Sequence, residues 1–143
     1  MKNRDYLEKI LPHKEPMILI DDVIRYSIDE KWLMAEVSID ETSQFYDKQI
    51  NGVPAIVGIE YMAQAIGCYA YYRNDEKKPK IGYLLGTKKY NIKIDKFAKN
   101  QKYIIRVEEI FLDEALASFS CFIYNKHNDI IADSTVTVYH ENK

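Results

Sequence analysis

The 143-residue sequence predicts an α+β domain built from two strands, one long apolar helix and four further strands. A nearly unbroken apolar run of helical length occupies the middle of the chain. Segments that alternate with a period of two lie on both sides of it, and turn residues separate those segments. Short connections favour antiparallel pairing. We therefore expect an antiparallel sheet of five to six strands wrapped around the helix, with residues 1–143 forming one domain.

The composition is that of an ordinary globular protein and excludes several functional classes. Hydrophobic residues make up 47% of the chain and charged residues 29%. A net charge of −2 gives no basic surface of the kind that binds nucleic acid. The N-terminal segment has no apolar stretch typical of a signal peptide, so we expect a cytoplasmic protein. Cys68 and Cys121 lie in apolar segments, which favours free thiols in the core over a disulfide or a metal pair.

Two strands are predicted before the helix. The first, residues 16–26, is an apolar run followed by acidic residues. The second, residues 31–39, alternates apolar and polar positions, which indicates one buried face. Residues 41–54 contain a Gly and a Pro but no clear period, so they are predicted to form a loop.

The helix is predicted over residues 55–73, with Pro54 at its start, where a missing N–H is tolerated. Its residues are apolar nearly all round, which is typical of a helix wrapped by the rest of the protein. Glu60 and Gln64 interrupt this run. A buried carboxylate is costly unless it is paired, neutralised or used, so Glu60 is either satisfied by nearby donors or functional. The same two polar residues argue against a membrane span.

Four strands are predicted after the helix, at residues 82–94, 101–111, 115–124 and 130–139. In the second of these, Tyr103, Ile105 and Val107 alternate with charged residues. A charged segment, residues 74–80, is predicted as a loop between the helix and the first of the four strands. We expect the four strands to form a meander, in which each pairs with the next.

Three segments resemble those of FabZ-like 3-hydroxyacyl-acyl-carrier-protein dehydratases, in the same order and with similar spacing. They are LPHKEPMILIDDV at residues 11–23, PAIVGIEYMAQAIG at residues 54–67 and GYLLGTKKYNIKI at residues 82–94. The second and third look most like the divergent dehydratase-like subunit of aryl polyene biosynthesis. The resemblance implies a hotdog fold, in which an antiparallel sheet wraps one long central helix.

The resemblance also implies a reaction. Members of this family eliminate water from a 3-hydroxyacyl thioester carried on the phosphopantetheine arm of acyl carrier protein, giving the trans-2-enoyl thioester, without a cofactor or metal of their own. A histidine removes the α-proton, and a helix carboxylate from the other subunit of a dimer helps to protonate the departing hydroxyl. Both groups must be positioned, because a thioester α-proton is weakly acidic and hydroxide is a poor leaving group.

Carried over to this sequence, the resemblance assigns the catalytic carboxylate to Glu60. Gln64, four residues later on the same side of the helix, is expected to orient Glu60 or an adjacent water. Val57 and Gly58 lie in the first turn, where their backbone N–H groups are expected to bind the thioester carbonyl.

The histidine of the family is missing. In the relatives it stands fourteen residues before the carboxylate, within a His-Phe-Pro-Gly phrase, and here that position holds Tyr46. Tyr46 is therefore a candidate for substrate binding. Two further interpretations of Tyr46 and Asp47 remain open: they are ordinary loop residues, or one of them is a substitute acid or base.

No histidine occurs between His13 and His127. His13 belongs to the LPH segment, which is not the catalytic position in the relatives. We expect it to be a cap or packing residue near the first strand, and we also retain it as a candidate for substrate binding. His127 lies in a predicted turn and His140 near the end of the chain, so both are expected to be exposed.

Several interpretations of function remain open. The chain is half of a hetero-oligomeric dehydratase whose histidine comes from a second hotdog subunit, or a self-sufficient homodimer that uses another base. Alternatively it is a non-catalytic acyl-binding or stabilising subunit, or an acyl thioesterase. The implied partners are acyl carrier protein and a second hotdog subunit or copy. Four helix tyrosines either line a tunnel for the acyl chain or pack in the core or a dimer interface: Tyr61, Tyr69, Tyr71 and Tyr72.

Overall fold

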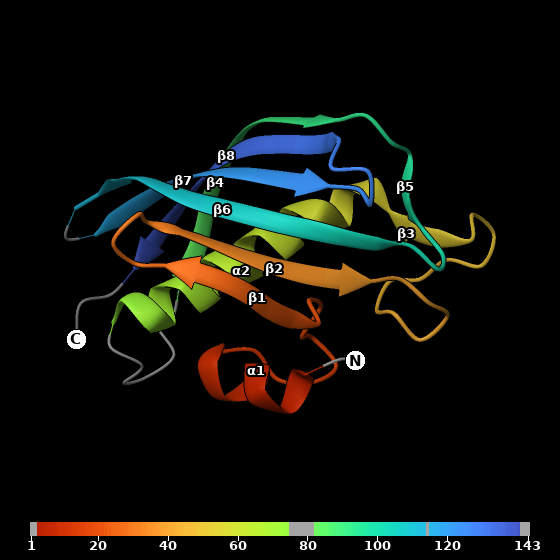
Figure 1. Cartoon of the computed structure of the whole chain (residues 1–143), viewed down its shortest axis with the longest axis horizontal. Coiled ribbons are helices and arrows are strands. Elements are labelled where there is room, and N and C mark those ends of the chain that lie inside the picture. Colours follow the sequence, from red (N-terminus) through yellow and green to blue (C-terminus); the bar gives the residue numbers. More distant parts are fainter. Residues whose placement is uncertain (1–2, 75–81, 114, 141–143) are drawn as a thin grey trace.

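The computed structural model of the chain describes residues 3–74, 82–113 and 115–140 (Figure 1). Its main sheet contains β1 (Asp22–Ser27), β2 (Trp32–Ser38), β4 (Gly82–Ile92), β6 (Lys102–Leu112), β7 (Leu116–Tyr124) and β8 (Ile130–His140). All neighbouring strands are antiparallel, in the order β1-β2-β6-β7-β8-β4. The helix α2 (Gly58–Arg73) runs along one face of this sheet (Figure 1). The predicted class, α+β with a long helix against five to six strands, is confirmed.

The position of β4 differs from the prediction. β4 does not join a meander with β6 but pairs with β8, at the far edge of the sheet. The physical reason is that β2 already occupies the outer edge of β6, which leaves the outer edge of β8 for β4. The strand that follows β4, β5 (Lys96–Ala98), pairs with β3 (Gly52–Pro54) in a small separate sheet. The predicted loop at residues 41–54 therefore ends in a strand.

The N-terminal part contains a short helix that the sequence analysis did not predict, α1 (Arg4–Ile10), which buries Leu7 and Ile10. The first strand is also shorter than predicted, because β1 begins only at Asp22. Residues 18–20 are buried and apolar, like the residues of a buried strand. However, two of their backbone N–H groups bond the side chain of Gln64 rather than a neighbouring strand.

The central helix begins with a 3₁₀ turn, η1 (Ala55–Val57), and continues as α2 to Arg73, where the prediction also ended it. The sheet wraps the helix as predicted, but the first turns of the helix are not fully covered. One face packs on the sheet, but along the opposite face Ile56 is 66% exposed and Glu60 is 40% exposed. The N-terminal segment covers the later turns of this face, since residues 17–20 bond the buried Gln64 and Leu11 packs on Gly67. The first turn, around Glu60, is left half-exposed.

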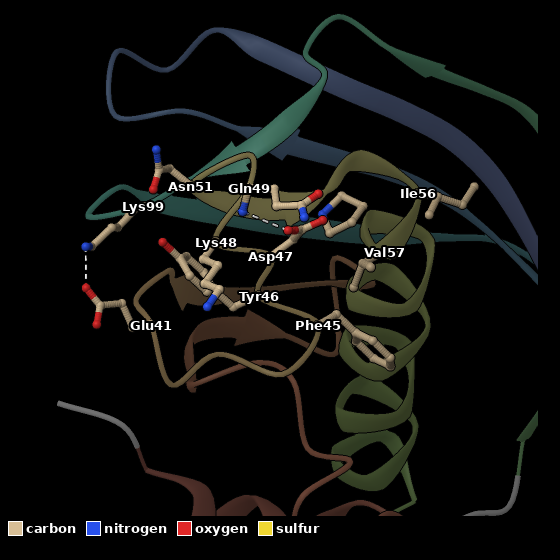
Figure 2. A pocket seen from close by; sticks show the side chains of 11 residues that line it. Glu41, Phe45, Tyr46, Asp47, Lys48, Gln49, Asn51, Ile56, Val57 and Lys99 are labelled. Carbon is tan, nitrogen blue, oxygen red and sulfur yellow. Dashed lines mark hydrogen bonds and ion pairs between the residues drawn. The ribbon is translucent and has the colours of Figure 1, made fainter.

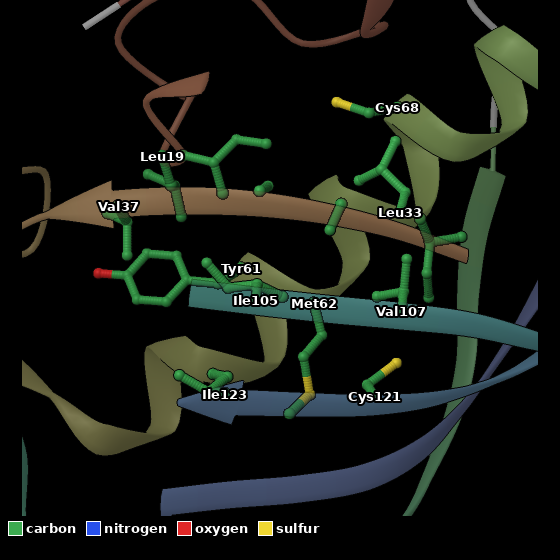
Figure 3. Close-up of a cluster of buried hydrophobic side chains, with 14 of the residues drawn as sticks. Leu19, Leu33, Val37, Tyr61, Met62, Cys68, Ile105, Val107, Cys121 and Ile123 are labelled. Carbon is green, nitrogen blue, oxygen red and sulfur yellow. The ribbon is translucent and has the colours of Figure 1, made fainter. Parts of the chain in front are cut away.

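The core lies between α2 and the concave face of the sheet (Figure 3). On β2, Leu33, Ala35 and Val37 are buried, which confirms the predicted alternation. Tyr61 and Tyr69 are almost fully buried, and their rings pack edge-on against Phe97 and Phe119 respectively. These two tyrosines are therefore core residues. Tyr71 and Tyr72 are half-buried, and Tyr72 stacks on Tyr26 with 4.0 Å between ring centroids.

The two cysteines are free and buried, as predicted. Burial raises the pKa of the Cys121 thiol to about 12, and burial likewise raises the pKa of the Cys68 thiol. His127 is exposed in a turn. Of the predicted loop at residues 74–80, residues 75–80 lie outside the described residues, as does the side chain of His140. Within the described ranges, no helix combines the length and the apolar character that a bilayer span requires.

Candidate functional site

Glu60 lies in the first turn of α2, on the face that the sheet leaves uncovered. The sequence predicted a buried carboxylate, but 40% of its side chain is exposed. The cause is that α2 directs Tyr61, Met62 and Ala65 into the core, so that Glu60 points away from it. A half-exposed carboxylate remains hydrated and needs no special compensation for burial. It is also accessible to a substrate or to another protein chain.

The polar partner of Glu60 is His13. The imidazole Nε2 of His13 lies 3.6 Å from Oε1 of Glu60. His13 was expected to act as a cap or packing residue or to bind substrate, and the structure places it beside the candidate carboxylate. No local sequence pattern could reveal this pair, because the two residues come from segments far apart in the chain. The contact exists only because the segment after α1 folds back along α2.

Gln64 is fully buried and binds backbone groups of that same segment. Its Oε1 accepts hydrogen bonds from the backbone N–H of Leu19 at 2.9 Å and of Ile20 at 3.5 Å. Its Nε2 donates to the backbone carbonyl of Met17 at 2.7 Å. Gln64 thus takes the place of a neighbouring strand for residues 17–20. The structure gives it the role of holding this segment on α2, and a catalytic role for Gln64 stays a prediction.

An open groove of about 1080 Å³ lies between the loop of residues 41–51 and the start of the central helix (Figure 2). Tyr46 and Val57, two of the predicted substrate-binding residues, both line it. Phe45, Pro54 and Ile56 add apolar surface. Phe45 and Ile56 are among the most exposed apolar side chains in the described part of the chain. Such surface is typical of a site that binds an apolar ligand or another protein.

The loop on the other side of the groove is fixed by its own hydrogen bonds. The backbone N–H of Asp47 donates to the carbonyl of Gly52 at 2.8 Å, and the Asp47 carboxylate accepts the backbone N–H of Gln49 at 2.9 Å. Lys99 forms an ion pair with Glu41 at the rim (Figure 2). The Asp47 side chain is therefore occupied in holding a turn, as expected of an ordinary loop residue.

Gly58, the fourth predicted binding residue, is buried beneath the start of α2. A Cβ atom at this position would lie 2.2 Å from the Tyr90 hydroxyl and 2.9 Å from the Phe97 ring. The Gly58 N–H donates to the carbonyl of Ala55 within the 3₁₀ turn, and the Tyr90 hydroxyl donates to the same carbonyl at 2.6 Å. Burial raises the pKa of Tyr90 to about 12, which keeps this donor protonated. Gly58 thus serves close packing that fixes the N-terminus of α2.

Gly58→Ala should lower the free energy of unfolding by about 1–3 kcal/mol, because the added methyl group overpacks this site. Either Tyr90 gives up its hydrogen bond to Ala55 or the start of α2 shifts. Urea denaturation measures the effect. Gly86→Ala is the matched control, since a Cβ there meets nothing within 4 Å. An equal loss of stability in both variants would contradict this packing role.

The predicted residues therefore divide into two groups. His13 and Glu60 form a pair on the uncovered face of α2, whereas Tyr46 and Val57 line the groove at its N-terminus. Ile56 connects the two groups, because it lines the groove and stands four residues before Glu60 on the same side of the helix. An apolar chain that enters the groove beside Ile56 would approach the Glu60 carboxylate.

Comparison with known proteins identifies similar chains. The family profile described as ApeP-like, ApeP dehydratase, matches residues 6–143. A 3-hydroxyacyl-[acyl-carrier-protein] dehydratase FabZ from Histophilus somni (strain 2336) is 34% identical over 83 residues, covering 54% of this chain and 53% of that protein. The match thus spans about half the length of this relative. The FabZ of Streptococcus agalactiae serotype V is 29% identical over 119 residues, covering 78% of this chain and 83% of that protein.

Solved structures show the same architecture. A chain of the dehydratase heterocomplex ApeI:P from Xenorhabdus doucetiae superimposes with a TM-score of 0.85 at 25% identity, covering 96% of this chain and 91% of that one. The thioesterase HI1161 from Haemophilus influenzae, with a TM-score of 0.65 at 15% identity, shares the fold alone. The profile covers nearly the whole chain, and the central helix lies against the same kind of sheet. This protein therefore has the hotdog fold and belongs to the ApeP-like dehydratase family.

Proposed function

We propose that this chain is one half of a two-chain 3-hydroxyacyl-acyl-carrier-protein dehydratase. It supplies Glu60 as the site carboxylate, and a second hotdog subunit supplies the histidine. The observation that carries the proposal is the position of Glu60, which is half-exposed on the uncovered face of α2, while Tyr46 occupies the place of the family histidine. A half-exposed carboxylate in a chain that lacks the family's His-Phe-Pro-Gly phrase suits a site shared between chains.

In the proposed reaction the partner's histidine takes the α-proton of the 3-hydroxyacyl thioester. The electron pair of that C–H bond forms the new double bond, and the bond from Cβ to oxygen breaks. Glu60 in its protonated form gives its proton to the departing hydroxyl, which leaves as water. The products are the trans-2-enoyl thioester and water, and one proton is carried by the histidine until it returns to Glu60 through solvent. The reaction needs no cofactor beyond the phosphopantetheine arm that carries the substrate.

The groove at the start of the central helix is the proposed path of the substrate. Its apolar residues, Phe45, Ile56 and Val57, suit an acyl chain, and Lys48 at the rim suits the acidic surface or phosphate of an acyl carrier protein. Tyr46 is proposed to line the path without replacing the histidine. We assign the proposed reaction to aryl polyene biosynthesis, because residues 54–67 and 82–94 resemble the dehydratase-like subunit of that pathway.

The ApeI:P heterocomplex suggests how a second subunit could complete the site around Glu60. The Xenorhabdus doucetiae relative was solved as a dehydratase heterocomplex. In this chain the face of α2 that carries Glu60 also exposes Ile56, and Phe45 points toward α2 from the loop (Figure 2). A second hotdog subunit over this face would bury these apolar side chains and place its own catalytic loop near Glu60.

Reconstitution tests the proposal. The purified chain alone should not dehydrate a 3-hydroxyacyl-acyl carrier protein, and addition of a hotdog subunit with the His-Phe-Pro-Gly phrase should give the enoyl product, measured by mass spectrometry of the carrier. Full turnover by the chain alone would instead favour a homodimer. If the partner subunit dehydrates the substrate equally well with and without this chain, the chain has a non-catalytic role. Hydrolysis of the thioester without enoyl product would favour a thioesterase.

A further inference from the structure

We propose that His13 is a positioning residue for Glu60, which holds the carboxylate in one orientation on the uncovered face of α2. The inference rests on the proposed function, since it assumes that Glu60 is the site carboxylate. It assigns to the LPH segment a role in the site that is separate from the role of the missing family histidine.

An exposed glutamate needs such a partner if it is to transfer a proton. Fixing a long flexible side chain costs rotamer entropy, which a preformed contact can offset. Glu60 is 40% exposed, and among the described residues its polar contact is the His13 imidazole, at 3.6 Å between Nε2 and Oε1. At this distance a small rotation of either side chain, or a bridging water, completes a hydrogen bond. His13 can therefore select one rotamer of Glu60 before the substrate arrives.

The two nitrogens of His13 lie in different surroundings. Nε2 faces Glu60, whereas Nδ1 is buried and has no hydrogen-bond partner among the described residues. Because Nδ1 is enclosed, Nε2 is the ring nitrogen that can meet a polar group. Nε2 faces the Glu60 carboxylate, to which an N–H at that atom can donate. The geometry therefore assigns His13 to positioning Glu60.

The backbone on both sides of His13 is fixed to α2, which makes the ring a rigid support. Before it, Leu11 is buried and packs so closely on Gly67 that a Cβ on Gly67 would lie 2.8 Å from the Leu11 side chain. After it, Met17 and Leu19 bind the Gln64 side chain. The segment is therefore attached to the helix at two points that bracket His13. Its ring cannot move far from the first turns of α2, where Glu60 lies.

Two substitutions in the reconstituted complex test the proposal by activity. His13→Leu removes the donor and should lower kcat by about 10- to 100-fold, as expected of a misplaced catalytic group, with KM changed less than about threefold. His13→Gln retains an N–H donor near the position of Nε2 and should restore kcat to within about threefold of wild type. His127→Leu, in an exposed turn, is the matched control and should behave as wild type. Melting temperatures of all variants show whether activity follows stability.

A spectroscopic measurement is independent of activity. In an imidazole ¹⁵N–¹H spectrum of the complex, His13 should show the proton on Nε2, and Glu60→Gln should shift that signal. Wild-type activity of His13→Leu, or equal losses in both His13 variants that follow the melting temperature, would overturn the positioning role. A proton on Nδ1 alone would overturn it too. The proposed function is tested separately: it fails if Glu60→Gln remains active. If Glu60→Gln is inactive but His13→Leu is fully active, only the inference about His13 is refuted.

Discussion

Glu60→Gln in the reconstituted complex should lower the rate of dehydration by about 10²- to 10⁴-fold, the usual contribution of a positioned general acid or base. The amide has nearly the same shape as the carboxylic acid but cannot give its proton to the departing hydroxyl. Because Glu60 is half-exposed and faces away from the core, the substitution should leave the fold and the melting temperature nearly unchanged. The measurement is the initial rate of enoyl-carrier formation under saturating substrate.

The matched control for this variant is Glu30→Gln, which removes one exposed carboxylate in the turn between β1 and β2. It changes the net charge equally but should not change the rate. If Glu60→Gln and Glu30→Gln have the same activity, Glu60 is not the site carboxylate. Loss of activity together with loss of complex formation, seen by size-exclusion chromatography, would show instead that Glu60 serves the subunit interface.

Gln64→Met should lower the free energy of unfolding by about 2–4 kcal/mol. Methionine fills nearly the same volume, so the loss arises from polar groups and not from a cavity. The substitution leaves the buried backbone N–H groups of Leu19 and Ile20 without their acceptor, and it removes the donor to the carbonyl of Met17. Each buried polar group without a partner costs about 1–3 kcal/mol. Chemical denaturation of the same assembly, with and without the substitution, measures the difference.

Gln49→Met is the control for this variant, because Gln49 is exposed and the same change there should be nearly neutral. Gln64→Met should also impair activity, through the loosened His13 segment. If Gln64→Met is as stable as wild type, then residues 17–20 are held in place by apolar packing and not by Gln64. If it is stable but inactive, Gln64 has the catalytic role that the sequence suggested.

The elements of this fold were predictable where local patterns decide them. The strand over residues 31–39 was predicted from its alternation, and β2 has the expected buried face. The helix was predicted from an apolar run that ends at Arg73, as observed. Two short strands were missed, β3 and β5, because three residues are too few to show a period. The start of the first strand was misplaced because the buried residues 18–20 bond a side chain, which no local pattern reports.

The sequence by itself determined the class of the fold, the candidate carboxylate Glu60 and the absence of a histidine at position 46. These properties depend on residue type and spacing along the chain, which are readable without coordinates. Only the tertiary structure decided that Glu60 is half-exposed, that His13 is its neighbour and that Gln64 binds the backbone of a distant segment. Each of these contacts joins residues far apart in the chain. They arise from how the N-terminal segment folds back along the face of α2 that the sheet does not cover.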